Sequence, residues 1–95
     1  MPAYVIMTEE IKDPAGMEEY AKAAMPTMGP ANAKVLAFDE QVDVLEGTWH
    51  GTRTVVLEFE SADAARSWYD SPEYQAAAKL RQAAGDTNAA IINGF

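Results

Sequence analysis

The chain has no cysteine and only one histidine, His50, among its 95 residues. The lack of cysteine excludes disulfides, thiolate metal sites, thiol nucleophiles and iron–sulfur clusters. A single histidine also excludes a metal site built on two imidazole ligands. We therefore expect no metal and no cofactor. Because proteins of reducing compartments rarely depend on disulfides, we also expect a cytoplasmic location.

Basic residues and long apolar runs are scarce too. Seven Lys and Arg residues stand against fifteen Asp and Glu, a net charge of −8, whereas nucleic-acid-binding proteins gather basic residues on one face. The same charge disfavours anionic membrane surfaces. No apolar run reaches the ~20 residues of a membrane-spanning helix. The charged residues within positions 9–13 leave no apolar core for a signal peptide. We expect neither a nucleic acid nor a membrane as partner.

Hydrophobic residues make up 48% of the chain, which predicts a folded globular protein. The length suits one domain, residues 1–95. A domain this short buries roughly 60–65% of the surface that its unfolded chain exposes. A second subunit would therefore add to its stability.

The first third of the chain predicts a strand and a helix. The apolar, partly β-branched run at residues 3–11 is typical of a strand buried on both faces. Asp13 and Pro14 are typical of a helix start, and we expect Pro26 to break this helix before Gly29-Pro30 ends it. The helix has one apolar stripe at helical spacing, which consists of Met17, Tyr20, Ala21, Ala24 and Met28.

The middle of the chain predicts further strands and one loop. Residues 33–38 are typical of a second strand, which residues 42–46 resume after a short polar break. Residues 47–52 contain two glycines and predict a loop. Residues 53–60 predict the third main strand, with Val55, Leu57 and Phe59 on one face and Thr54, Val56 and Glu58 on the other.

The last third predicts a helix in two segments, followed by a strand. Ser61 is expected to cap the first segment, and Ser71 with Pro72 to restart the helix. Gly85 is expected to end it, and residues 87–92 form the last strand. The expected apolar side of the second segment consists of Ala76, Ala77, Leu80 and Ala84.

The element order β-α-β-β-α-β predicts an α+β, ferredoxin-like sandwich with a four-stranded antiparallel sheet. Both helices would cover one face of the sheet and leave the other face open. Since the strands carry apolar residues on both faces, we expect a second copy of the sheet to cover the open face. Such a homodimer would bury upwards of ~1,200 Å².

The run Trp-Tyr-x-Ser-Pro-x-Tyr at residues 68–74 resembles the DUF1330 family of the dimeric α/β-barrel superfamily. The similarity extends over nearly the whole chain through weaker matches, which are Tyr4, Val5, Glu46-Gly47, Trp49, Glu58-Phe59, Ala64-Ala65 and Arg81. The resemblance implies a homodimer whose two sheets face each other around a small cavity. Other branches of that superfamily include cofactor-free monooxygenases, lactone isomerases and haem enzymes, and a shared fold does not transfer their activities.

Two residues are candidate catalytic bases. His50 lies between Gly47 and Gly51 and could act as a general base near neutral pH, or be a solvated loop residue. Glu58 is expected on the strand face away from the helices. There it could act as a base in a cavity between sheets, or be a charge at the mouth of the barrel.

Arg53 and the aromatic residues are candidate ligand-binding residues. Arg53 could hold a carboxylate in bidentate fashion, or form a structural ion pair with Glu46 or Asp70. The candidate walls of a ligand cavity are Trp49, Trp68, Tyr69 and Tyr74. Because each large aromatic side chain buries roughly 150–250 Å², core packing is the competing explanation for these residues.

Two functions follow from these features. The first is a small homodimer that binds a small organic molecule between its two sheets without chemistry of its own. The alternative is a cofactor-independent isomerase or monooxygenase acting on a small organic acid or aromatic molecule. In that case His50 or Glu58 would be the base and Arg53 the group that holds an anion.

Overall fold

The computed structural model describes all 95 residues and has seven elements. They are β1 (Ala3–Ile11), α1 (Pro14–Met28), β2 (Lys34–Asp39), β3 (Arg53–Phe59), α2 (Ala62–Asp70), α3 (Pro72–Ala84) and β4 (Gly85–Asn93). This order confirms the predicted ferredoxin-like fold, in which α2 and α3 together occupy the place of the second helix.

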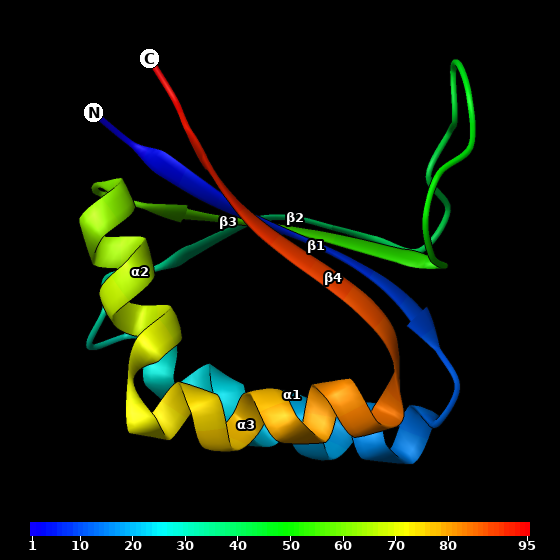
Figure 1. Ribbon diagram of the computed structural model, residues 1–95, viewed down its shortest axis with the longest axis horizontal. Coiled ribbons are helices and arrows are strands. Elements are labelled where there is room, and N and C mark those ends of the chain that lie inside the picture. Colours follow the sequence, from blue (N-terminus) through cyan, green and yellow to red (C-terminus); the bar gives the residue numbers. More distant parts are fainter.

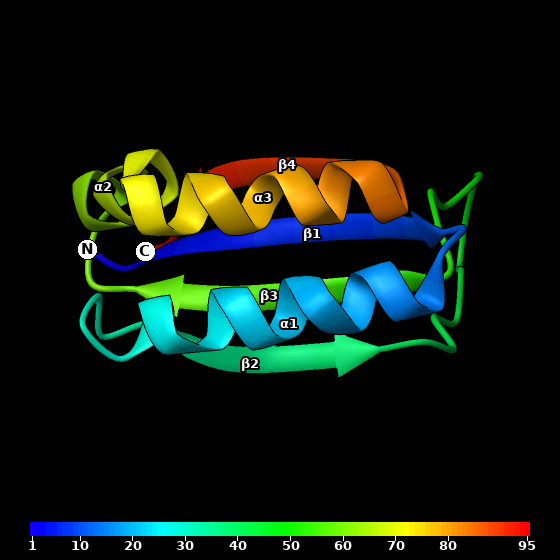
Figure 2. The same cartoon turned by 90° about the horizontal axis from the view of Figure 1, so that it is seen from below.

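The four strands form one antiparallel sheet in the order β2-β3-β1-β4. All three helices lie on one side of this sheet, and its other side is covered by no element (Figure 1). Seen from the helix side, α1 and α3 lie side by side and run along the direction of the strands (Figure 2). None of the three helices combines the length and the apolar character that a membrane-spanning helix needs.

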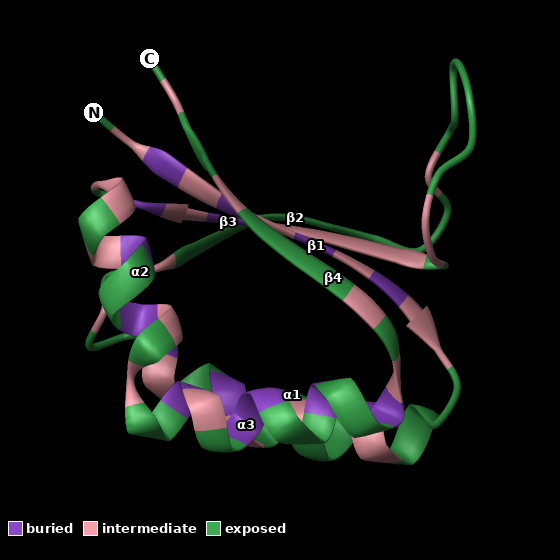
Figure 3. Cartoon of the chain, viewed as in Figure 1, coloured by how far each residue is buried: buried purple, intermediate pink, exposed green.

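The register of β1 separates a core face from an open face. Val5 and Met7 pair with residues of β3 and β4 on the helix side, where they are buried. Ile6 and Thr8 point to the opposite side and are half-buried. The alternation of buried and half-buried residues along β1 is visible in Figure 3, which also shows β4 largely exposed. The expected burial of β1 on both faces is therefore not reached within one chain.

Two serines fix the positions of α2 and α3. Ser61 Oγ accepts a hydrogen bond of 3.1 Å from the Ala64 amide, which caps α2 as predicted. Ser71 Oγ accepts from the Tyr74 amide at 3.2 Å and donates to the Trp68 carbonyl at 2.8 Å. Ser71 therefore ends one helix and begins the next.

Three predicted details of the elements are wrong. Pro26 lies inside α1 without ending it, because it removes a helical bond only two residues before the helix ends. Residues 42–46 form no strand and belong to the loop that follows β2. On α3, Ala76 and Leu80 are exposed, because the restart at Pro72 turns a different side inward; the buried residues are Tyr74, Ala77, Ala78, Arg81 and Ala84.

Candidate functional site

The loop between β2 and β3, residues 40–52, rises on the open side at one end of the sheet (Figure 1). Two side-chain hydrogen bonds attach it to the open face. Trp49 Nε1 donates to Thr54 Oγ1 of β3 at 2.8 Å, and His50 Nδ1 lies 2.7 Å from Thr8 Oγ1 of β1. The loop therefore places an aromatic and an imidazole ring above the two central strands.

One nitrogen of His50 is hydrogen-bonded within the chain, and the other is buried. Nδ1 is bonded to Thr8, while Nε2 is buried, has no hydrogen bond and lies 3.8 Å from Asp86 Oδ2 of β4. A general base needs a nitrogen that reaches the substrate. In this arrangement His50 links the loop to β1 through Thr8 and lies beside Asp86 of β4. To act as a base, His50 would have to move away from one of these two residues.

The open face and the loop above it carry exposed apolar side chains. Ile6 of β1 pairs with Val56 of β3 and Ala90 of β4, and these three form the apolar centre of the face. The exposed large hydrophobic residues on this side of the molecule are Val44, Leu45, Trp49 and Ile92. An apolar surface of this kind is typical of an interaction site.

Glu58 lies on the open face as predicted, but far from His50. Its register partners are Tyr4 of β1 and Lys34 of β2. Tyr4 is four residues from Thr8, the partner of His50, so Glu58 and His50 are roughly 13 Å apart along the strands. Within one chain, these two candidate bases cannot act on the same atom.

Arg53 lies on the helix side of the sheet, with other partners than predicted. Its Nη2 donates to Glu40 Oε2 at 3.3 Å, and its Nη1 is 3.7 Å from Glu9 Oε1. Glu9 faces Arg53 directly in the β1–β3 register, which explains the pairing. The predicted partners are therefore wrong: Glu46 makes no ion pair, and Asp70 pairs with Arg66 at 3.1 Å.

Trp68, Tyr69 and Tyr74 pack on the helix side as well, away from Trp49 and His50. The rings of Trp68 and Tyr74 are 3.9 Å apart, and those of Tyr69 and Tyr74 are 5.7 Å apart. Trp68 and Tyr74 are buried, and Tyr69 packs against the same hydrophobic core. This corrects the expectation that all four aromatic residues line one cavity, because the sheet separates Trp49 from the other three.

The structure reveals a buried polar group that the sequence analysis missed. Glu9 is only 2% exposed, and its burial raises the pKa of its carboxyl group, an effect that Arg53 and Arg81 partly offset. Nearby, the hydroxyl groups of Tyr20 and Tyr74 are 2.8 Å apart. Burial is also the main reason why the pKa of Tyr20 is raised. The alternation along β1 was the available signal, since it turns residue 9 inward with residues 3, 5 and 7.

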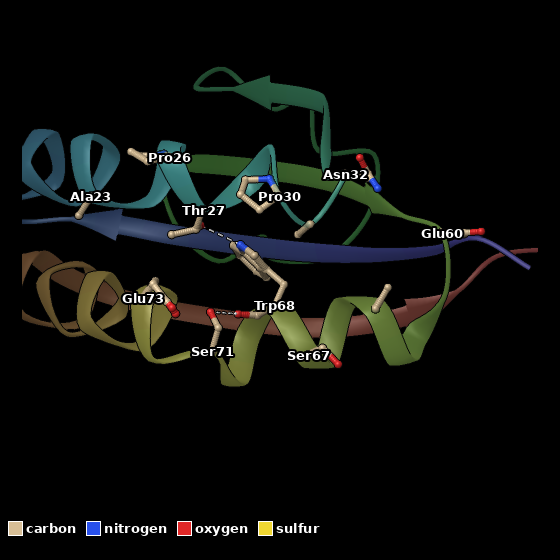
Figure 4. A pocket seen from close by; sticks show the side chains of 12 residues that line it. Ala23, Pro26, Thr27, Pro30, Asn32, Glu60, Ser67, Trp68, Ser71 and Glu73 are labelled. Atoms are coloured by element: carbon tan, nitrogen blue, oxygen red, sulfur yellow. Dashed lines mark hydrogen bonds between the residues drawn. The ribbon is translucent and has the colours of Figure 1, made fainter.

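The largest hollow, about 660 Å³, lies between the end of α1 and α2 (Figure 4). Trp68 forms its floor and donates from Nε1 to Thr27 Oγ1 at 2.9 Å. Ser71 is bonded to the Trp68 carbonyl and to the Tyr74 amide. The polar atoms of these residues are thus used to join the helices, so this hollow is a weaker candidate than the open face.

Comparisons with known proteins agree with this architecture. A family model described as "Domain of unknown function (DUF1330)" matches residues 2–95. No curated protein matches the chain. The RPA0582 protein of unknown function from Rhodopseudomonas palustris is 20% identical, with a TM-score of 0.78 over 99% of this chain and 82% of that one.

Two further solved structures resemble the chain. A dimeric ferredoxin-like protein of unknown function from Jannaschia sp. CCS1 is 13% identical, with a TM-score of 0.70 over 99% of this chain and 100% of that one. SnoaB, a cofactor-independent oxygenase from Streptomyces nogalater, is 11% identical, with a TM-score of 0.69 over 98% and 92% of the respective chains. At these identities the likeness establishes the fold alone.

Proposed function

The chain belongs to the DUF1330 family, as its motifs predict, and from this premise we propose that it is a homodimer that binds a small organic molecule between two facing sheets. The observation that carries the proposal is the loop 40–52, which is hydrogen-bonded onto the open face at Thr8 and Thr54. In a dimer, this loop would close one end of the space between the sheets.

The open face supports the dimer. Its centre, Ile6, Val56 and Ala90, is apolar but uncovered in the single chain. Exposed apolar residues on the loop, Val44 and Leu45, extend that surface upward, where a facing sheet would lie. Similar chains from three organisms are described as dimeric. A second copy of the same face is the simplest cover.

The enzyme alternative has less support from the geometry. His50 has one nitrogen bonded to Thr8 and the other beside Asp86, and Glu58 lies at the far end of the face. Arg53, the expected anion-holding residue, is on the other side of the sheet. A constellation of nucleophile, base and anion-binding group is thus not assembled on the open face of one chain.

Substitution of Val56 by glutamate is expected to convert the dimer into a monomer. Val56 lies at the centre of the open face, where a carboxylate would be desolvated against its symmetry mate. Native mass spectrometry at micromolar concentration should show dimer mass for the wild type and monomer mass for Val56→Glu. Ala76→Glu, on the exposed side of α3, is the matched control and should remain dimeric. A wild type that is monomeric would contradict the proposal.

Substitution of His50 by alanine is expected to abolish ligand binding while the dimer persists. Loss of the bond to Thr8 frees the loop that would close the inter-sheet space. The measurement is a thermal-shift screen of small organic acids and aromatic molecules. Compounds that raise the Tm of the wild type should leave that of His50→Ala unchanged. Consumption of such a compound by the wild type, lost in His50→Ala, would instead establish the enzyme alternative.

A further inference from the structure

A smaller cavity lies on the helix side of the sheet, between α1 and the strands. Its volume is about 110 Å³, and twelve of its fourteen lining residues are hydrophobic. Four of the chain's five methionines line it, namely Met7, Met17, Met25 and Met28. Methionine side chains are flexible and polarizable, and they adapt to varied apolar ligands. The cavity is thus an apolar space with an adjustable wall.

The two other lining residues, Glu9 and Arg53, give the cavity a charged end. Glu9 is 2% exposed and forms an ion pair with Arg53, whose Nη1 is 3.7 Å from Glu9 Oε1. Arg53 Nε is also buried without a hydrogen-bond partner. A buried guanidinium N–H without a partner is unfavourable. This end of the cavity therefore has one unpaired donor, Arg53 Nε, beside the acceptor oxygens of Glu9.

The cavity has a route to the surface beside Arg53. A neighbouring surface hollow shares Met17, Ala21, Phe38 and Arg53 with it. The guanidinium of Arg53 lies over the ring of Phe38, 4.6 Å from the ring centre. Phe38 is an exposed residue of the edge strand β2, so it can move without disturbing the core. Met25 and Val35, which also line the cavity, are exposed as well, so the cavity opens to solvent between α1 and β2.

We propose that this cavity binds a small neutral molecule with an apolar body and one hydroxyl group, which donates to Glu9 and accepts from Arg53. At about 110 Å³ the cavity is smaller than an engineered cavity of ~150 Å³ that binds benzene, so a single ring requires the flexible methionine side chains to move. A hydroxyl group satisfies an acceptor and a donor at once. The Glu9 carboxylate would repel an anionic ligand, and the Arg53 guanidinium would repel a cationic ligand.

This site is independent of the inter-sheet site proposed above, because the sheet lies between them. It is formed by one chain and needs no partner. A monomeric Val56→Glu variant should therefore still bind at this site. If this variant is monomeric and still binds the ligand, the cavity site holds whatever the outcome for the dimer. If the wild type is a dimer but does not bind at the cavity, only the present inference fails.

Phenol is the test probe, with toluene as its hydroxyl-free analogue and benzoate as its anionic one. Methyl resonances of ¹³C-labelled methionines report binding in the folded, full-length protein. Phenol should shift the methyl signals of the four lining methionines and leave that of Met1, which is 81% exposed, unchanged. Toluene should bind at least ~10-fold more weakly than phenol, the equivalent of a hydrogen bond to a charged group. Benzoate should not bind.

Two substitutions locate the binding site. Ala24→Leu fills the cavity and should abolish the phenol shifts, whereas Ala15→Leu, at an exposed position of the same helix, should leave them unchanged. Glu9→Gln should weaken the binding of phenol at least ~10-fold and change the binding of toluene less than ~2-fold. If Glu9→Gln does not fold, the Ala24→Leu comparison still decides. Shifts that survive Ala24→Leu, equal affinities for phenol and toluene, or binding of benzoate would each overturn the proposal.

Discussion

Trp68→Ala is expected to lower the free energy of unfolding by about 3–5 kcal/mol, the usual cost of truncating a buried aromatic residue. Trp68 is 4% exposed and packs against the rings of Phe59 and Tyr74, at 5.2 and 3.9 Å between ring centres. Its loss also removes the bond to Thr27, which joins α2 to the end of α1. Cavity formation and a broken contact between helices therefore act together.

Trp49→Ala provides the matched control, and urea unfolding followed by circular dichroism at one protein concentration provides the measurement. Trp49 is 47% exposed, and its single hydrogen bond to Thr54 contributes about 1 kcal/mol. The two tryptophans should thus differ clearly in their effect on stability. Equal losses from both substitutions would show that the assignment of Trp68 to the core and Trp49 to the open side is wrong.

Gly51→Ala is expected to destabilise the protein by about 3 kcal/mol or more, from backbone strain together with overpacking. Gly51 has a φ of +84°, in the left-handed region that favours glycine. A Cβ atom there would lie 2.6 Å from the backbone of Glu9 in β1, which cannot move without disturbing the centre of the sheet. The neighbouring bond from the Thr52 amide to the Glu9 carbonyl, 2.8 Å, would be strained as well.

Gly47→Ala separates the two causes. Gly47 has a similar φ of +77°, but nothing lies within 4 Å of the place where its Cβ would be. The free energy of unfolding of Gly47→Ala should therefore fall by only ~1–2 kcal/mol, the cost of placing alanine in the left-handed conformation. Thermal unfolding of both variants measures the difference. If Gly47→Ala proved as harmful as Gly51→Ala, the close approach of the loop to β1 would not be what fixes the loop.

These substitutions also bear on function, because Gly51 lies next to His50. The approach of residues 51 and 52 to Glu9 brings His50 over Thr8. Glu9 therefore contacts both sides of the sheet. Its backbone carbonyl binds the loop on the open face, and its side chain lies at the charged end of the cavity between α1 and the strands. Gly51→Ala should therefore weaken ligand binding on the open face along with stability.

The sequence by itself determined the element order, the strand faces and the helix starts, because these depend on local chemistry. Alternating residues set the faces of β1 and β3, and Ser61 and Ser71 cap helices through groups only three residues away. The open face and its need of a cover follow from the same alternation. Glu9 was within reach of this reasoning, since its odd position in β1 turns it toward the core.

Only the tertiary structure decided which distant groups meet. Arg53 pairs with Glu9, 44 positions away in the numbering, because the antiparallel register of β1 and β3 sets them opposite each other. The same register separates Glu58 from His50, and the close contact at Gly51 bonds the loop to Thr8. Pairings of this kind depend on strand order and on loop closure, which spacing along the chain does not encode. For that reason the sequence supplied the candidate residues, and the fold decided which of them share a site.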